Sequence, residues 1–211
     1  MNNESPVYSS SISIAIGAVA ILASAVAAYI LLIEGKSRKR KTGNGKENNS
    51  EFAILRKYIG NFLMIPSFRA YSKKEAIEKL VENAHARFPN IICNVEHAKE
   101  AVFAREESMP TGLDNGIAVP HGRTDGVKEI AGVLALVDNS ENENGIIPDY
   151  DTIDHSKIQI LCLMLIPDSI NTPYLQLIAA FIRILQDTDN LEDLLSCKTS
   201  EQMTRFFCSL T

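Results

Sequence analysis

Two long, uncharged and mainly apolar runs limit what this chain can fold into. They are Ile130–Val137 and Ile158–Ile166, and polar residues or a proline bound each of them. A strand that is apolar on alternate residues faces water on one side, whereas an apolar run predicts a strand covered on both faces. Helical patterns precede and follow the two runs. Strands alternating with helices indicate an α/β domain in which helices flank a sheet on both faces.

The flanking helices are indicated by caps and by apolar spacing. Ser72 and Glu75 form a capping box, and the apolar residues that follow recur at helical intervals. Further elements are expected as a short helix and then an extended stretch over Phe52–Ile65, helices over Val95–Arg105, Leu175–Leu185, Leu191–Leu195 and Ser200–Leu210, and a short strand over Ile117–Val119. Asp138–Asp154, with six acidic residues and no basic one, is interpreted as an exposed loop.

A second apolar run lies near the N-terminus. Ile12–Ile33 is 22 residues long and uncharged, and as a helix it would span about 33 Å, enough to cross a bilayer. Five basic residues follow between Lys36 and Lys41. By the positive-inside rule, the N-terminus lies outside and the rest of the chain in the cytoplasm. A cleaved signal peptide fits less well, because positive charge should precede a shorter run.

These features divide the chain into three parts. Residues 1–35 are predicted to be a transmembrane anchor in the inner (cytoplasmic) membrane, residues 36–51 a basic stretch and flexible linker, and residues 52–211 a folded domain. From Phe52 onward there are 15 basic and 22 acidic residues, which argues against nucleic-acid binding. The four cysteines are widely spaced, as in a reducing compartment, and Cys162 is expected in the core.

One segment concentrates the residues suited to chemistry. Residues 111–126 hold four glycines, a short strand and the tripeptide Pro120-His121-Gly122, with Arg123 next and Arg105 upstream. Pro120 cannot donate to a β-ladder, so the strand is expected to end there or to lie at an edge, presenting His121 with open space beside it. Imidazole can accept a phosphoryl group that guanidinium and amide groups stabilise. A histidine that only closes a turn is the alternative.

The remaining residues offer few other sites. His85, His97 and His155 are interpreted as solvated or capping side chains, and Asp149, Asp151 and Asp154 as part of a solvated loop. No spacing matches a metal site, and no Walker-type or Rossmann glycine loop is present, so neither a metal nor a cofactor is expected.

The segment Asp114-Asn-Gly-Ile-Ala-Val-Pro-His121-Gly, with Arg105-Glu-Glu and Thr111-Gly before it, resembles the enzyme IIA domain of the bacterial phosphotransferase system, of the fructose/mannitol and nitrogen-regulatory type. The resemblance extends over most of residues 52–211. It implies a mixed β-sheet flanked by helices and a phosphohistidine at His121, supplied by the histidine phosphocarrier protein. A cysteine on a sugar-transporting IIB domain would then receive the group, or the phosphorylation state would act as a signal.

The resemblance also implies roles for the neighbouring residues. Arg105 matches an arginine of the family's active site. From the residues themselves, Arg123 is expected to help neutralise the phosphate and backbone amides around Gly116–Gly122 to orient it, with Thr111 in support. One departure is Tyr174, where the family usually has a second histidine. Tyrosine can donate a hydrogen bond but carries no positive charge near pH 7.

Three functions therefore remain open for the chain. The first is a membrane-tethered phosphocarrier, a transferase of the phosphotransferase system. The second, which Tyr174 favours, is a non-catalytic regulatory module that controls a membrane transporter. The third is a structural membrane protein whose domain has lost its activity.

Overall fold

A computed structural model describes residues 48–142, 144–170 and 173–210. Five strands form one mixed sheet, β1 (Phe62–Phe68), β2 (Ile117–Ala118), β3 (His121–Thr124), β4 (Ala131–Val137) and β5 (Ile160–Pro167), in the order β1-β4-β5-β2, with β3 also on β5. The pair β4–β5 is antiparallel, and the other pairs are parallel. The mixed sheet that the resemblance implied is confirmed.

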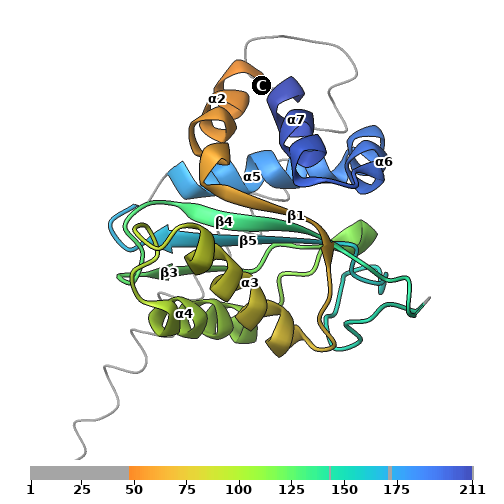
Figure 1. The fold of residues 1–211 in the computed structure, drawn as a ribbon, viewed down its shortest axis with the longest axis horizontal. Coiled ribbons are helices and arrows are strands. Elements are labelled where there is room, and N and C mark those ends of the chain that lie inside the picture. The colour runs from red at the N-terminus through yellow and green to blue at the C-terminus, as the bar shows by residue number, and fades with distance from the viewer. Residues whose placement is uncertain (1–47, 143, 171–172, 211) are drawn as a thin grey trace, which may run out of the picture. The chain divides into compact units, whose positions relative to one another are not determined.

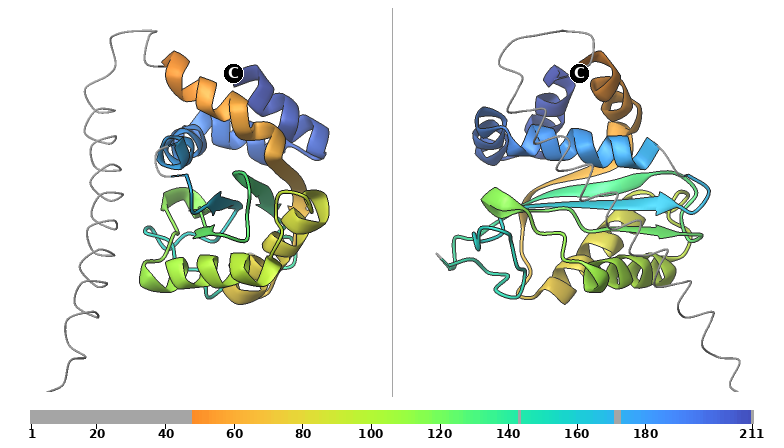
Figure 2. Two further views of the ribbon diagram at one scale, coloured as in Figure 1. Left: turned by 90° about the vertical axis from the view of Figure 1, so that its left-hand side faces the viewer. Right: turned by 180° about the vertical axis from the view of Figure 1, so that it is seen from behind.

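Helices cover both faces of this sheet (Figure 1). One face carries α2 (Asn48–Tyr58), α5 (Pro173–Gln186), α6 (Thr188–Ser196) and α7 (Ser200–Leu210), and the other carries α3 (Lys73–Arg87) and α4 (Val95–Ser108). Two short 3-10 helices, η1 (Ile59–Asn61) and η2 (Asp114–Gly116), precede β1 and β2. The view from behind in Figure 2 shows β5 and β3 between α5 and α4.

The sheet separates two apolar cores because side chains alternate along each strand. In β4 and β5, Leu134, Cys162 and Met164 belong to the core under α5, whereas Val133 and Leu163 belong to the core over α3 and α4. All of these residues are fully buried. The strands covered on both faces, and the core position of Cys162, are therefore confirmed.

The strands β2 and β3 are two parts of one edge, interrupted by Pro120. Both pair with β5 in the same register, from Ile117 opposite Ile160 to His121 opposite Met164. Pro120 cannot donate a hydrogen bond, but its carbonyl oxygen accepts one from the Met164 amide at 3.0 Å. The edge position was predicted, but the strand resumes at His121 instead of ending before it.

The predicted helices are confirmed, with small shifts at their ends. Ser72 caps α3, since its Oγ accepts the Glu75 amide hydrogen bond at 3.1 Å. The helix α4 runs three residues past Arg105, and β1 continues through Pro66 with an irregular register near its end. The interpretation of Asp138–Asp154 as simply exposed is wrong, because three of its residues are buried in the core over α3 and α4. These are Ile146, Ile147 and Tyr150.

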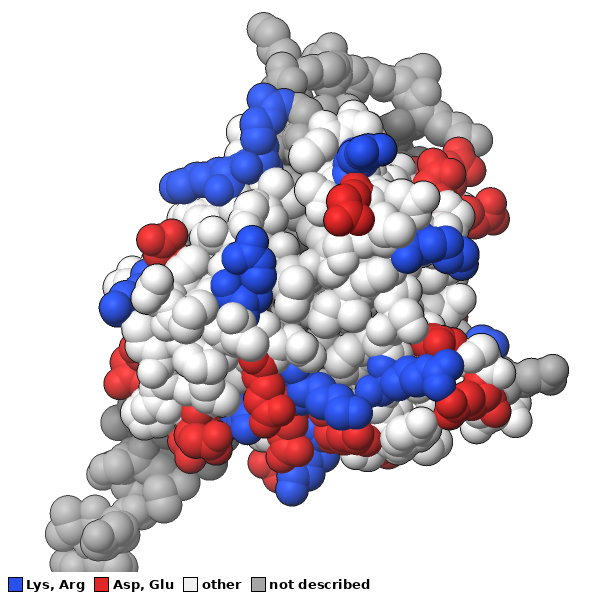
Figure 3. Space-filling view, in the orientation of Figure 1, with Lys and Arg blue, Asp and Glu red and all other residues white. Residues whose placement is uncertain are grey.

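The uncharged run 12–33 and the basic stretch after it lie outside the described residues. In the part of the chain that is described, no helix combines the length and apolar character needed to span a bilayer. Lys, Arg, Asp and Glu side chains intermingle over α3 on the face shown in Figure 3.

Candidate functional site

His121 is the first residue of β3 and lies at the edge of the sheet. Its register partner is Met164, so its side chain belongs to the α5 face, together with that of Arg123 two residues later. His121 is only 9% exposed. The expectation of open space beside the imidazole is therefore wrong. Because the edge strand continues past Pro120, the ring lies in the layer between β3 and α5.

One hydrogen bond fixes the form of this ring. His121 Nδ1 lies 2.9 Å from the Val119 carbonyl oxygen, which can only accept, so Nδ1 carries the proton. In the neutral ring the lone pair is then on Nε2. Burial, opposed by the Val119 hydrogen bond and assisted by the positive charge of Arg105, lowers the pKa of His121 to about 4. The imidazole is therefore neutral at pH 7.

Arg105 comes from the last turn of α4, on the opposite face from α5. Its Nη1 donates to the Met109 carbonyl oxygen at 2.8 Å. Burial lowers the pKa of Arg105, while the negative charges of Glu106 and, when ionised, Tyr174 raise it. Since Arg105 also acts on the pKa of His121, its charge lies within electrostatic range of both the imidazole and Tyr174.

Arg123 and Tyr174 form the remaining part of the site. The guanidinium carbon of Arg123 lies 5.6 Å from the centroid of the Tyr174 ring, a cation–π distance, and its Nη2 donates to the Asp168 carbonyl oxygen at 2.7 Å. Tyr174 is buried in the first turn of α5. The structure thus places three elements around one site: β3 carries His121 and Arg123, α5 carries Tyr174 against Arg123, and α4 carries Arg105 within electrostatic range of His121.

The glycines serve packing instead of opening space at the imidazole. A Cβ on Gly122 would lie 2.7 Å from the Val102 amide nitrogen, so β3 rests directly on α4 at this position. Gly116 has a φ of +69°, and a Cβ there would lie 2.2 Å from the Lys157 carbonyl oxygen. Both glycines therefore allow close backbone approaches, and Gly122 does so toward α4, on the opposite face of β3 from the His121 ring.

Thr111 lies away from the ring and is held by α4. Its Oγ1 donates to Glu106 Oε2 at 2.5 Å, and its amide donates to Glu106 Oε1 at 3.1 Å. Sequence reasoning overlooked Glu106. A signal was present, because Glu106 follows Ala98 and Val102 at intervals of four residues and so occupies the apolar stripe of α4.

The other histidines make separate contacts. His85 Nδ1 lies 2.8 Å from the Ile92 carbonyl oxygen, and His97 Nδ1 lies 2.8 Å from Asp125 Oδ1 at the surface. His155 lies in a loop with a φ of +57°. Within the described residues, no three His, Cys, Asp or Glu side chains are grouped so that they could hold a metal ion.

The fold and the site define a class of protein, a three-layer α/β domain with a neutral histidine at the sheet edge, Arg123 two residues along the same strand and Arg105 within electrostatic range. Residues 61–209 match the family described as "Phosphoenolpyruvate-dependent sugar phosphotransferase system, EIIA 2". This match covers most of the chain, and the chain belongs to that family.

Known relatives include both regulators and transport components. The chain is 25% identical over 126 residues to the nitrogen regulatory protein of Bradyrhizobium diazoefficiens, covering 60% of this chain and 76% of that protein. It is 30% identical over 135 residues to the 2-O-alpha-mannosyl-D-glycerate-specific EIIABC component of the Escherichia coli phosphotransferase system, covering 64% of this chain and 20% of that protein.

Solved structures show the same fold. The nitrogen regulatory protein IIA-Ntr of Neisseria meningitidis aligns with a TM-score of 0.57 at 21% identity, covering 71% of this chain and 94% of that one. The mannitol IIA of Escherichia coli aligns with a TM-score of 0.52 at 20% identity, covering 68% and 94%. A structure of mannitol IIA with phosphorylated IIB from Escherichia coli also aligns, with a TM-score of 0.52 at 19% identity, covering 69% and 94%.

Proposed function

We propose that this domain accepts a phosphoryl group on Nε2 of His121. The observation that carries the proposal is the hydrogen bond from Nδ1 to the Val119 carbonyl oxygen, in a ring whose pKa is lowered to about 4. Both features leave the Nε2 lone pair available at neutral pH. Membership of the EIIA family supports phosphoryl transfer as the reaction.

The donor would be the phosphorylated histidine phosphocarrier protein. The Nε2 lone pair of His121 attacks phosphorus, a new N–P bond forms, and the donor's N–P bond breaks with its electron pair remaining on the donor imidazole. The proton of His121 stays on Nδ1, hydrogen-bonded to the Val119 carbonyl oxygen. In the onward step, a cysteine thiolate on a IIB partner attacks phosphorus and the Nε2–P bond breaks.

The surrounding side chains have distinct parts in this proposal. Arg105 and Arg123 supply positive charge to the phosphoryl oxygens, and such positioning and charge stabilisation are most of what phosphoryl transfer requires. Tyr174 lies near Arg123 and within electrostatic range of Arg105, and it can donate one hydrogen bond. The low exposure of His121 restricts water, which protects phosphohistidine against hydrolysis.

The direct test is transfer of ³²P from the phosphorylated phosphocarrier protein to the full chain. We expect one acid-labile phosphoryl group per wild-type chain and none on His121→Gln. His97→Gln is the matched control, because His97 forms a surface ion pair, and it should label as wild type does. An unlabelled wild-type chain, or undiminished labelling of His121→Gln, would contradict the proposal.

A second candidate function is signalling, in which the phosphorylation state or the domain itself controls a transporter. Tyr174 favours it, because the site lacks a second imidazole for onward transfer. The nitrogen regulatory relatives are consistent with it. Recovery of a membrane transporter with both wild type and His121→Gln would favour the non-catalytic module, whereas rapid transfer to a IIB domain would favour the carrier.

We also propose that residues 12–33 tether the domain to the inner membrane, with the domain in the cytoplasm. The support is the length and lack of charge of this run and the basic residues after it. The full chain should remain with membranes after an alkaline carbonate wash. Replacing Ala18 and Ala25 by arginine should release it, since a charge at the centre of a span costs about 3 kcal/mol. Release of the wild-type chain by carbonate would contradict the tether.

A further inference from the structure

Glu106 is a buried acidic side chain outside the residues assigned to the phosphate. It is 5% exposed and lies on the stripe of α4 that packs against the sheet. Burying a carboxylate is unfavourable unless hydrogen bonds or a countercharge replace the lost water. The partners that compensate Glu106 therefore indicate what the carboxylate holds in place.

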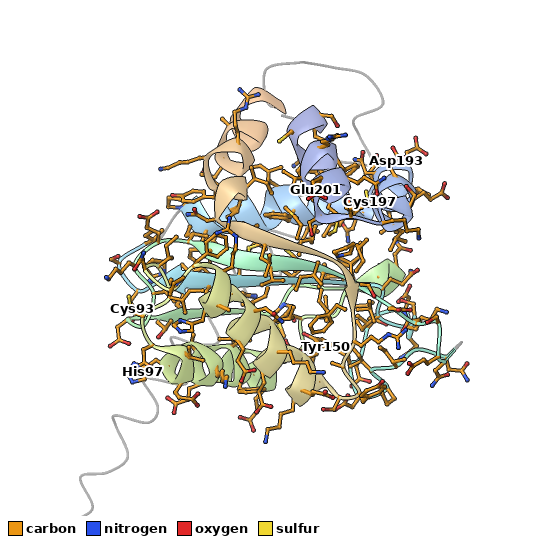
Figure 4. The ribbon with its side chains drawn as sticks, viewed as in Figure 1. Cys93, His97, Tyr150, Asp193, Cys197 and Glu201 are labelled. Atoms are coloured by element: carbon orange, nitrogen blue, oxygen red, sulfur yellow. The ribbon has the colours of Figure 1, made fainter. Side chains whose placement is uncertain are left out.

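Those partners bring three segments together. The carboxylate accepts both hydrogen bonds that Thr111 can donate, from its amide and from its hydroxyl, and Lys73 Nζ lies 3.8 Å from Glu106 Oε1. The Tyr150 hydroxyl lies 3.2 Å from Thr111 Oγ1, and the Lys73 ammonium lies 5.1 Å from the Tyr150 ring centroid. Figure 4 labels Tyr150 on the α3 side of the sheet. In this cluster, side chains from the start of α3, the end of α4 and the acidic loop meet near Thr111.

From Thr111 a short path of hydrogen bonds leads to the imidazole. The Thr111 carbonyl oxygen accepts the Val119 amide hydrogen bond at 3.1 Å. The Val119 carbonyl oxygen then accepts the Nδ1 proton of His121 at 2.9 Å. The position of this last acceptor decides which ring nitrogen keeps the proton, so anything that holds Val119 in place also selects the tautomer.

We propose that Glu106, through Thr111 and Val119, is the positioning residue that holds His121 in the tautomer whose lone pair is on Nε2. Glu106 does not touch the phosphoryl group in this scheme. Its neighbour Arg105 supplies the cation, so one turn of α4 sets both the charge and the orientation of the ring. The link to rate rests on the proposed phosphorylation of His121, whereas the tautomer can be measured without it.

The experiment compares three threonine variants of the full chain. Thr111→Val removes the hydroxyl that donates to Glu106 and retains the shape, and Thr111→Ser restores the hydroxyl. Thr152→Val is the matched control, since Thr152 is also buried but its hydroxyl donates to the Ser156 carbonyl oxygen within the acidic loop. Nitrogen-15 NMR of the His121 imidazole at pH 7.5 reports the tautomer, and labelling by the phosphorylated phosphocarrier protein reports the rate.

Wild type, Thr111→Ser and Thr152→Val should show a single tautomer protonated at Nδ1. Thr111→Val should show a mixture of tautomers and about a tenfold slower labelling, because a misplaced nucleophile loses its alignment with phosphorus. Glu106→Gln, which keeps the volume and one acceptor oxygen, should change in the same direction by a smaller factor. If Thr111→Val does not fold, Glu106→Gln provides the test instead.

The proposal is overturned if Thr111→Val or Glu106→Gln, when folded, keeps the wild-type tautomer and rate, or if Thr152→Val changes both as much as Thr111→Val does. If no protein is labelled but Thr111→Val still shows the tautomer shift, the result would support the positioning role of Glu106 and contradict the proposed phosphorylation of His121.

Discussion

The two ends of α4 place ionisable groups in opposite surroundings. At its N-terminal end, His97 forms a solvent-exposed ion pair with Asp125, and Figure 4 shows His97 at the margin of the molecule. At its C-terminal end, Arg105 lies within electrostatic range of the buried His121, and Glu106 is buried against Thr111. The same helix therefore takes part in a surface interaction at one end and in a buried cluster at the other, and burial is the difference between them.

Because of this difference, the pKa values of the two histidines are shifted in opposite directions. The hydrogen bond to Asp125 raises the pKa of His97, since the partner favours the charged ring. Burial lowers the pKa of His121, since a charged ring would lose its hydration. The contributions of His97 and His121 to the free energy of unfolding should therefore change with pH in opposite directions.

The largest expected effect concerns stability against pH. The pKa of His121 is about 4 in the folded state and near 6.5 unfolded, so the unfolded state binds more protons between these values. His121 should therefore lower the free energy of unfolding by about 3 kcal/mol as pH falls from 6.5 to 4. Urea titrations of wild type and His121→Gln between pH 4 and 8 measure it.

His121→Gln should lack this part of the pH dependence, and its stability relative to wild type should improve steadily toward pH 4. The same difference taken for His97→Gln should have the opposite sign, because the raised pKa makes its contribution largest at low pH and removes it as pH rises through the folded pKa. Parallel curves for wild type and His121→Gln would contradict the neutral, buried ring.

The second largest effect concerns the charge of Arg105. Arg105→Gln should slow labelling of His121 about a hundredfold, since it removes a cation from the transferring phosphoryl group. It should also raise the pKa of His121, because the charge of Arg105 lowers it. The labelling rate and an NMR titration of the imidazole measure these two consequences.

Lys99→Gln is the matched control for Arg105→Gln. Lys99 is a cation on the same helix, and its ammonium forms ion pairs with Glu82 and Glu96. Its replacement should leave both the rate and the His121 titration unchanged. An equal loss in the two variants would show that general charge on α4, rather than Arg105, matters.

A smaller effect is expected where the middle of α4 meets β3. Gly122→Ala would place a Cβ 2.7 Å from the Val102 amide nitrogen and 2.8 Å from the Ala101 carbonyl carbon, so strand and helix must separate. Overpacking of this kind should destabilise the fold by about 2 kcal/mol in urea unfolding. Gly60→Ala is the control, since a Cβ there meets nothing within 4 Å. Equal stability of the two variants would contradict the close packing.

The smallest effect belongs to the exposed ion pair. Asp125→Asn should return the pKa of His97 toward its ordinary value, because Asp125 is the main cause of the raised pKa. It should leave the labelling rate of His121 unchanged. An NMR titration of His97 checks the first expectation, and a changed labelling rate would show that the two ends of α4 are coupled.

Patterns within short segments predicted the elements well. The apolar runs became β4 and β5, and the capped pattern after Ser72 became α3, because local spacing decides which faces can be buried. The buried residues of the acidic loop were missed. Ile146, Ile147 and Tyr150 have no periodic pattern, and only the core over α3 and α4 gives them a place.

Local sequence patterns were enough to predict the helices, the strands covered on both faces, and the edge position imposed by Pro120, which lacks an amide hydrogen. They also predicted that His121, Arg105 and Arg123 carry the chemistry. The packing of the folded chain placed the Tyr174 ring near the Arg123 guanidinium, buried the His121 ring in its neutral form, and put the Glu106 carboxylate against Thr111. These properties depend on how β3, α4 and α5 pack, and burial and electrostatic range are fixed by that packing rather than by spacing along the chain.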